Sequence, residues 1–256
     1  MIPATLAIAA ILIALLSMLV LLGGQRAEAL LTAEVRRKLL HIVMGSVSLI
    51  LPLIFDTAVH VWWLAGLAFC LLMIIRRIRL LKTRIGGAIH TIDRDSIGDL
   101  CFPLGVATLF SLAGDNYLQY LVPMLILTFG DSLAALVGIH YGRFRFPTLD
   151  GHKTVEGSLT LFGISLLCVV LPFGISGKIE LGPLMLIGLN LALLITLVEA
   201  ITWRGIDNFV LPLVAFYLLQ AYLPLDVASL LSQALLNSAL LLAALAMLYR
   251  LQAEKE

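Results

Sequence analysis

One acidic residue, Asp131, lies inside a long apolar run and is followed by small residues at regular spacing. Ala135, Gly138 and Gly142 come four, seven and eleven residues later, so all of them share one face of a helix with the acid. A carboxylate inside an apolar helix is unfavourable in a membrane and therefore indicates a functional site. A face with one acid and almost no side-chain bulk lets a second backbone, or a ligand, approach closely.

A short polar motif follows, in which Lys153, Thr154 and Glu156 come just before Gly157. The lysine can bind a phosphate, the hydroxyl can bind a phosphate or a metal's water shell, and the glutamate offers the hard oxygen that Mg²⁺ prefers. Glu156 also opens the next apolar run, and a helix N-terminus favours an anion. The motif is not a P-loop, because His152 stands where that loop needs glycine. The alternative is a capped loop with a Lys/Glu ion pair.

Three further polar clusters lie where apolar runs begin or end. They are Arg36, Arg37, Lys38 and His41; the segment from His90 through Arg94 to Asp99; and Glu199, Asp207 and Asn208. Arg94 has the planar fork that suits a phosphate, and the third cluster could complete a divalent-metal or ribose site. Each cluster also has an alternative interpretation, as basic residues flanking a membrane span or as side chains that cap helix ends.

These clusters belong to a chain of 256 residues, of which 61% are hydrophobic and 13% charged. Soluble domains have about a quarter charged residues, so the composition predicts an integral membrane protein. A helix that crosses a membrane needs roughly 20 apolar residues, and runs of that length repeat along the chain. The net charge of +1 gives no indication of a nucleic-acid partner, and we expect none.

The distribution of positive charge predicts the orientation. We expect an all-α, multi-pass bundle of about nine transmembrane helices, or about eight if the weak run 97–113 does not cross. The expected spans are 2–22, 39–55, 59–75, 97–113, 117–139, 158–173, 184–200, 209–223 and 227–249. With the N-terminus outside and the C-terminus in the cytoplasm, all but one of the 17 Lys and Arg residues face the cytoplasm. The segment 76–96 is then cytoplasmic, with an interfacial helix as one interpretation, and 140–156 is a cytoplasmic loop.

These residues together resemble the membrane lipid-alcohol kinases that use CTP, the group of dolichol kinase, phytol kinase and CTP-dependent diacylglycerol kinase, which is distantly similar to the CDP-diacylglycerol synthases. The resemblance rests on Arg37-Lys38-x-x-His41, Arg94 with Gly98 and Phe102-Pro103-Leu104-Gly105, Asp131-x-x-Ala134-x-x-x-Gly138-x-x-x-Gly142, Lys153-Thr154-x-Glu156-Gly157, and Glu199 with Asp207-Asn208 and Pro212. It covers most of residues 35–215, the expected catalytic core of a single domain 1–256. Residues 1–22 are then a peripheral first span, and 224–256 a C-terminal span and tail.

The resemblance implies an integral membrane kinase that transfers the γ-phosphoryl group of CTP to a polyprenol-, dolichol- or phytol-like alcohol at the cytoplasmic face, with Mg²⁺. It implies that Asp131, Lys153 and Glu156 are catalytic, and that Asp131, Glu156 and Asp207 hold the metal. The nucleotide would contact Arg94, Gly138, Gly142, Lys153, Thr154, Gly157 and Asn208. Further candidates for the substrate or its phosphate are Arg37, Lys38, His41 and Glu199.

Two other functions remain open at this point. A cytidylyltransferase acting on a phosphorylated lipid would transfer the α-phosphorus with cytidine and release pyrophosphate, but the Lys-Asp and Pro-Gly-His-Gly-Gly segments of that family are absent from the sequence. A secondary transporter would use Asp131 to couple ions to solute movement and would place polar residues at the midplane of several spans. Here the polar residues gather at the cytoplasmic ends. A homodimer also remains open.

Overall fold

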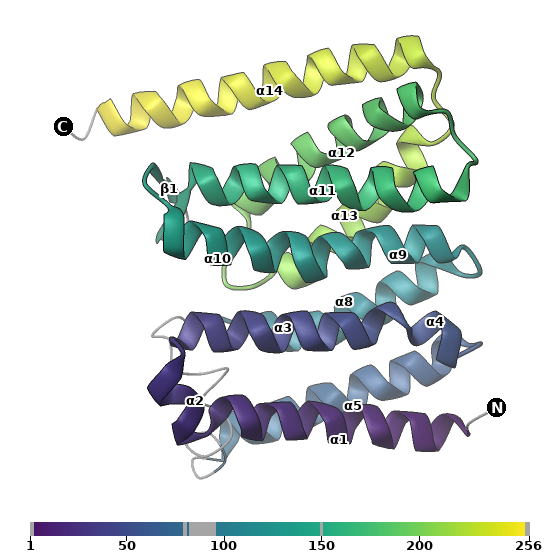
Figure 1. Ribbon diagram of the computed structural model, residues 1–256, viewed down its shortest axis with the longest axis vertical. Helices are drawn as coiled ribbons and strands as arrows, with labels where there is room; N and C mark the ends of the chain where they lie inside the picture. The colour runs from purple at the N-terminus through teal and green to yellow at the C-terminus, as the bar shows by residue number, and fades with distance from the viewer. Residues whose placement is uncertain (1–2, 79–80, 82–95, 149–150, 254–256) are drawn as a thin grey trace.

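The computed structural model describes residues 3–78, 81, 96–148 and 151–253. The described chain forms a bundle of helices that lie alongside one another, and α1 begins at the opposite end of the bundle from the end of α14 (Figure 1). The helices are α1 (Ala4–Gly23), α2 (Gln25–Leu30), α3 (Ala33–Leu49), α4 (Leu51–Ile54), α5 (Ala58–Arg77), α8 (Gly98–Ala113), α9 (Tyr117–Leu125), the π-helix η1 (Ile126–Asp131), α10 (Ser132–Tyr141), α11 (Val155–Ser176), α12 (Leu181–Ile201), α13 (Asp207–Tyr222) and α14 (Val227–Ala253). The predicted all-α class is confirmed, with the addition of one short pair of strands, β1 (Arg145–Thr148) and β2 (Gly151–Thr154).

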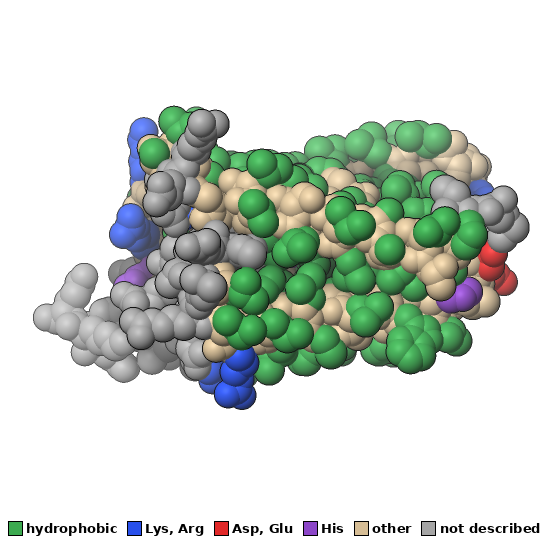
Figure 2. Space-filling view, turned by 90° about the horizontal axis from the view of Figure 1, so that it is seen from below, with side chains coloured by type: hydrophobic (Ala, Val, Ile, Leu, Met, Phe, Trp, Pro, Cys, Tyr) green, Lys and Arg blue, Asp and Glu red, His purple; other side chains and the backbone are tan. Residues whose placement is uncertain are grey.

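Apolar helices long enough to cross a membrane make up most of this bundle. In the described residues there are 6 of them: α1, residues 33–54, α5, residues 117–141, α11 and α12. The helix α8 and residues 227–243 of α14 are apolar but shorter. Figure 2 shows apolar side chains across the middle of one face, with Lys and Arg side chains gathered at one end. The chain is therefore a multi-pass membrane protein, while the number of crossings and the outward N-terminus remain predictions.

The helix α3 begins at Ala33 rather than at Leu39, where the apolar run was predicted to start. Thr32 caps it, because its side chain accepts a hydrogen bond from a backbone N–H of the first turn. Glu34 lies in that turn, where a carboxylate interacts favourably with the helix dipole. As a result Lys38 lies inside the helix instead of in the loop before it.

The segment 140–156 is not the plain loop that we predicted, since it contains the antiparallel strands β1 and β2. Gly151 opens β2 at φ 121°, a conformation that favours glycine. Thr154 closes β2 and also caps α11, because its hydroxyl accepts a hydrogen bond from the backbone N–H of Gly157 at 3.1 Å. The hairpin thus places Lys153 just before the first turn of α11.

The helical stretch from α9 to α10 is continuous but changes its hydrogen-bond pattern in the middle. Residues 126–131 form η1, a π-helical turn of the kind that often occurs at functional sites. Pro123, which has no N–H to donate, lies inside the end of α9. Asp131 is the last residue of η1, so the acid singled out from the sequence lies where the π-helix returns to an α-helix.

The small-residue face that follows Asp131 packs against α11. A Cβ added at Gly138 would lie 2.7 Å from Thr154 Oγ1, and one added at Gly142 would lie 2.5 Å from Thr154 Cγ2. A Cβ at Gly157 would lie 2.9 Å from the carbonyl oxygen of Ala134. These distances are too short for real Cβ atoms. The face therefore permits the close approach of a second backbone, which is one of the two alternatives predicted for it.

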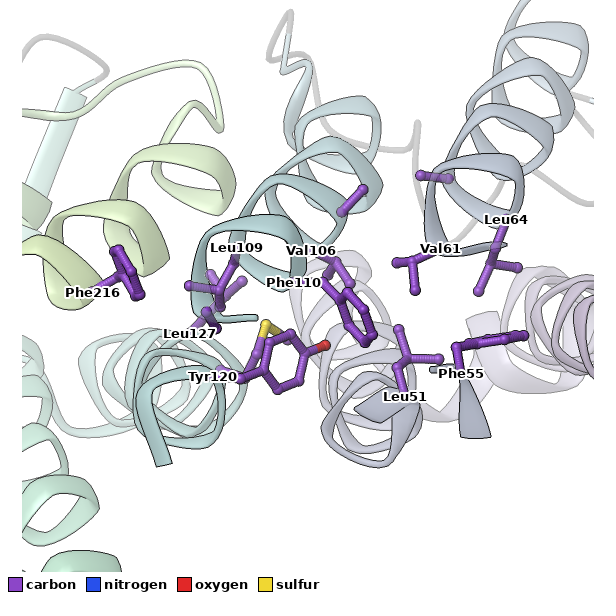
Figure 3. Packing of buried hydrophobic residues seen from close by; sticks show 14 of the residues in the cluster. Leu51, Phe55, Val61, Leu64, Val106, Leu109, Phe110, Tyr120, Leu127 and Phe216 are labelled. Atoms are coloured by element: carbon purple, nitrogen blue, oxygen red, sulfur yellow. The ribbon is translucent and has the colours of Figure 1, made fainter. Parts of the chain in front are cut away.

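One hydrophobic cluster fills the space between α4, α5, α8 and α9 (Figure 3). Within it the rings of Phe110 and Tyr120 meet edge to face, with centroids 5.7 Å apart, an arrangement that aromatic pairs prefer. The buried Tyr120 hydroxyl donates to the carbonyl oxygen of Ser48 at 2.8 Å. This contact joins α9 to α3 and satisfies the only polar atom of a large apolar side chain.

A buried amide pair attaches α14 to the rest of the bundle. The Nδ2 group of Asn237 donates to Asn190 Oδ1 at 2.8 Å and to the Tyr222 hydroxyl at 3.2 Å. The Nδ2 group of Asn190 in turn donates to the carbonyl oxygen of Leu230 at 3.0 Å. Because hydrocarbon offers no alternative partner, these contacts specify how α14 lies on α12 and α13.

Replacing Asn237 with Leu removes both donated hydrogen bonds and leaves the Asn190 amide oxygen without this donor. We expect the free energy of unfolding in detergent to fall by about 1–2 kcal/mol and protease to cut more readily before α14. The matched control is Ser238→Leu, which changes the neighbouring, exposed position of α14 and should leave both measurements as in the wild type. Equal stability of the two variants would contradict the anchoring role.

Candidate active site

The carboxylate of Asp131 forms a buried ion pair with Lys38 of α3. Lys38 Nζ lies 2.6 Å from Asp131 Oδ2 and 3.4 Å from the Asp131 carbonyl oxygen. Only 4% of the Lys38 side chain and 6% of the Asp131 side chain is exposed. A buried ion pair stabilises a fold no better than a well-packed apolar pair of similar volume, because both ions lose their hydration. Chemistry therefore explains this pair better than stability does.

His41 lies on the same face of α3 as Lys38 and makes a second polar contact to η1. Its Nε2 donates to the carbonyl oxygen of Leu127 at 3.0 Å, since a carbonyl can only accept. The same nitrogen is 3.8 Å from Asp131 Oδ2. The imidazole ring meets Phe102 of α8 edge-on, with centroids 5.0 Å apart. His41 thus connects α3, η1 and α8 beside the carboxylate.

A second ion pair joins the hairpin to α12. Lys153 Nζ lies 2.6 Å from Glu199 Oε1 and also donates to the Glu199 carbonyl oxygen. Thr202 Oγ1 donates to the same carbonyl oxygen at 3.0 Å, just beyond the end of α12. The Lys153 side chain remains 22% exposed, so it lies partly at the surface.

The carboxylate of Glu156 holds the hairpin to the first turn of α11. Its Oε1 accepts hydrogen bonds from the backbone N–H of Arg143 at 2.9 Å and of Phe144 at 3.3 Å. The backbone N–H of Val155 donates to the Phe144 carbonyl oxygen at 2.9 Å and closes the same turn. In this arrangement Glu156 is directed toward the backbone of the hairpin.

Asn208 joins the first turn of α13 to the first turn of α8. Its Nδ2 donates to the carbonyl oxygen of Gly98 at 2.8 Å, and the side chain is buried. A Cβ at Gly98 would lie 2.9 Å from that nitrogen and 3.2 Å from the Cα of Gly205, so glycine is needed there. Gly205 itself has φ 82°, which also favours glycine. The link between α12 and α13 is therefore held closely against α8.

The two ion pairs and Asp207 form one charged cluster. Asp207 interacts electrostatically with Asp131, Lys38 and Lys153, and Glu199 interacts with Asp131 and Asp207. Arg37 also interacts electrostatically with Asp131 and Asp207. Its Nε lies 2.9 Å from Oε2 of Glu34. Asp131 and Lys153 therefore share one electrostatic environment, although each is paired with another residue.

A third ion pair lies at the start of α8 and was not predicted. Arg76, near the end of α5, donates from Nε to Asp99 Oδ2 at 3.1 Å, and its Nη2 also contacts Asp99. The same Nη2 donates to the carbonyl oxygen of Ser96 at 2.6 Å. The predicted phosphate ligand Arg94, and most of the segment 76–96 with its expected interfacial helix, lie outside the described residues.

The acidic residues that the structure describes do not make up a metal site by themselves. Among the residues with assigned structure, no group of three or more His, Cys, Asp or Glu could hold a metal ion by itself. Mg²⁺ is commonly bound through one or two carboxylates together with substrate phosphates. Asp131 and Asp207 are two carboxylates of the charged cluster that interact electrostatically with each other. The carboxylate of Glu156 faces the hairpin amides instead.

Lys38 is the residue whose role the sequence suggested least clearly, because positive residues before a span are expected anyway. The available signal was its spacing, since Lys38, His41 and Gly45 share one face of α3. A Cβ at Gly45 would lie 2.3 Å from Thr128 Oγ1 of η1. A face with a cation, an imidazole and a glycine therefore packs directly against the π-helical turn.

This chain is similar to a phytol kinase of Synechocystis. The two are 30% identical over 195 residues, which cover 71% of this chain and 76% of that protein. No family model matches the chain, and no solved structure matches it. The aligned length, together with the apolar helices and the charged cluster, leads to one conclusion: the chain belongs to the lipid-kinase family that contains this phytol kinase.

Proposed function

We propose that the protein transfers the γ-phosphoryl group of CTP to the hydroxyl of a long-chain lipid alcohol at the cytoplasmic face of the membrane, with Mg²⁺. The similarity to a phytol kinase supports a kinase that acts on a lipid alcohol. The observation that carries the choice of site is the buried pair of Lys38 and Asp131. It keeps a carboxylate charged beside further cations, and phosphoryl transfer depends on such positioning and charge neutralisation.

In the proposed reaction the alcohol oxygen attacks the γ-phosphorus of CTP. A new oxygen–phosphorus bond forms, the bond between the γ-phosphorus and the bridging oxygen breaks, and CDP leaves. The hydroxyl proton passes to Asp131, whose carboxylate can accept it as a general base. Lys38 Nζ, 2.6 Å from Asp131 Oδ2, holds that oxygen in place, and His41 Nε2 lies 3.8 Å from it.

We assign the nucleotide to the side of the cluster formed by β2 and the start of α11. Lys153 offers a partly exposed cationic side chain, and the positive end of the α11 dipole favours an anion. Arg94 and Asn208 remain candidates for further nucleotide contacts, as the sequence suggested. Gly138, Gly142 and Gly157 contribute by letting α10, which follows Asp131, approach the end of β2 and the start of α11, which follow Lys153.

For Mg²⁺ we assign Asp207, since Asp131 is assigned the role of general base, and we assign Glu156 to holding the hairpin. Asp207 interacts electrostatically with Asp131, and phosphate oxygens would complete the coordination. Bound Mg²⁺ would neutralise the negative charge of the phosphates. From the sequence we expected Glu156 to be a metal ligand as well. We do not assign it to the metal here, because its carboxylate already accepts two backbone hydrogen bonds.

The purified protein should transfer label from the γ-phosphorus of CTP to phytol or another long-chain alcohol and release one CDP for each lipid phosphorylated. Chelating Mg²⁺ should stop the transfer. If label from the α-phosphorus enters the lipid and pyrophosphate appears, the protein is a cytidylyltransferase instead. If label passes from ATP and not from CTP, the proposed donor is wrong.

Asp131→Asn should lower kcat by about 100-fold or more, because the amide cannot take the hydroxyl proton. The rate is measured at saturating CTP, Mg²⁺ and alcohol. The matched control is Asp115→Asn, which makes the same change at an exposed residue between α8 and α9 and should keep the wild-type rate. A fully active Asp131→Asn enzyme would exclude Asp131 from the chemistry.

Lys38→Met should destabilise the protein by about 3–5 kcal/mol, since it leaves the Asp131 carboxylate buried without its partner. The double variant Lys38→Met, Asp131→Asn should recover most of that loss and yet remain inactive. Unfolding in detergent and the phosphorylation rate measure the two effects separately. A double variant as unstable as Lys38→Met would show that the charge of Asp131 does not need Lys38.

A further inference from the structure

An elongated cavity of about 120 Å³ lies between α1, α3, α5 and α8. Away from one polar end its walls are mainly apolar and include Leu15, Met44, Ala65, Ala68 and Val106. The space would hold several water molecules, but a buried water needs two to four polar partners, and away from the polar end the lining offers only Ser48. A hydrocarbon is therefore the better occupant of most of its length.

The two ends of the cavity differ in chemistry. Arg37, His41, Asp99 and Asn208 line one end, beside the charged cluster. Leu51 and Val61 line the other end, and both belong to the hydrophobic cluster of Figure 3, where they gather with Val106 from three helices. The cavity thus has a polar opening and an apolar floor, which matches a molecule with a polar head and a hydrocarbon chain.

The polar end lies directly beside the proposed reacting group. His41 lines the cavity, and its Nε2 is 3.8 Å from Asp131 Oδ2. Along α5 the lining runs from Leu72 near the polar end to Val61 at the floor. At a rise of 1.5 Å per residue, the distance along α5 from Leu72 to Val61 is about 16 Å. This is roughly half the thickness of a bilayer's hydrocarbon core. A chain of that length would lie inside the protein with its hydroxyl at the polar end, beside His41.

We propose that this cavity binds the hydrocarbon chain of the acceptor and admits a single-chain alcohol, with the hydroxyl between His41 and Asp99. The proposal rests on the kinase function proposed above. The chain would pass Ala68 first and Ala65 next, where the small side chains leave room for it. A lipid with two chains has no second slot in this cavity, so diacylglycerol should be a poor acceptor.

The experiment compares Ala68→Phe with Gly66→Phe in phosphorylation of primary isoprenoid alcohols of increasing chain length. Phenylalanine at position 68 would fill the cavity, whereas at Gly66 an added Cβ meets nothing within 4 Å and the position is exposed. Ala68→Phe should raise KM for the long alcohols on the order of tenfold or more, with a smaller effect on short ones and none on the KM for CTP. Gly66→Phe should retain the wild-type chain-length profile.

A nucleotide-free measurement separates this proposal from the kinase function. Phytol should raise the melting temperature of the wild type and of Gly66→Phe in detergent, but not that of Ala68→Phe. Should Ala68→Phe fail to fold, Ala65→Val provides a milder obstruction and should shorten the accepted chain.

The outcomes then distinguish the two proposals. If the wild type phosphorylates no alcohol while the shift in melting temperature follows the cavity variants, the kinase function fails and the binding site stands. If phosphorylation is normal but the folded variants at positions 65 and 68 change neither the chain-length profile nor the shift, the cavity proposal is overturned. Equal phosphorylation of diacylglycerol and of a single-chain alcohol would also overturn it.

Discussion

A charge without a partner is strongly unfavourable inside an apolar helix bundle, and the contact between Lys38 and Asp131 meets this constraint for both residues. The contact requires α3 to start early enough to carry Lys38 into the bundle, which the cap at Thr32 allows. It also requires α3 to lie close to η1, which Gly45 allows. The early start of α3 and its close packing against η1 are thus both needed to bury this ion pair.

The hairpin extends this arrangement to the second half of the chain. Thr154 ends β2, caps α11 and fills the space left by Gly138 and Gly142, so one residue positions the strand and two helices. Lys153 then reaches α12 from a strand whose backbone is paired. A cation held in this way is placed by backbone geometry, which gives more precise positioning than an unpaired loop.

The helices were predictable because the length of apolar runs in a membrane follows directly from bilayer thickness, and the burial of Asp131 followed from its place inside such a run. Its partner was not predictable. Lys38 is 93 residues away, and the tendency of positive charge to flank spans already explained it. The hairpin was missed because its strands have only four residues each, and the orientation of Glu156 depends on that hairpin.

At the proposed nucleotide site, the ammonium group of Lys153 is already paired with the Glu199 carboxylate. Any phosphate that binds the lysine has to displace this internal counter-ion or share the ammonium with it. The net affinity for the phosphate is then the difference between its contact with Lys153 and the Glu199 contact that it replaces. In the proposed reaction, such an exchange would keep the nucleotide from being held too tightly, and Glu199 would pair with the lysine again as CDP departs.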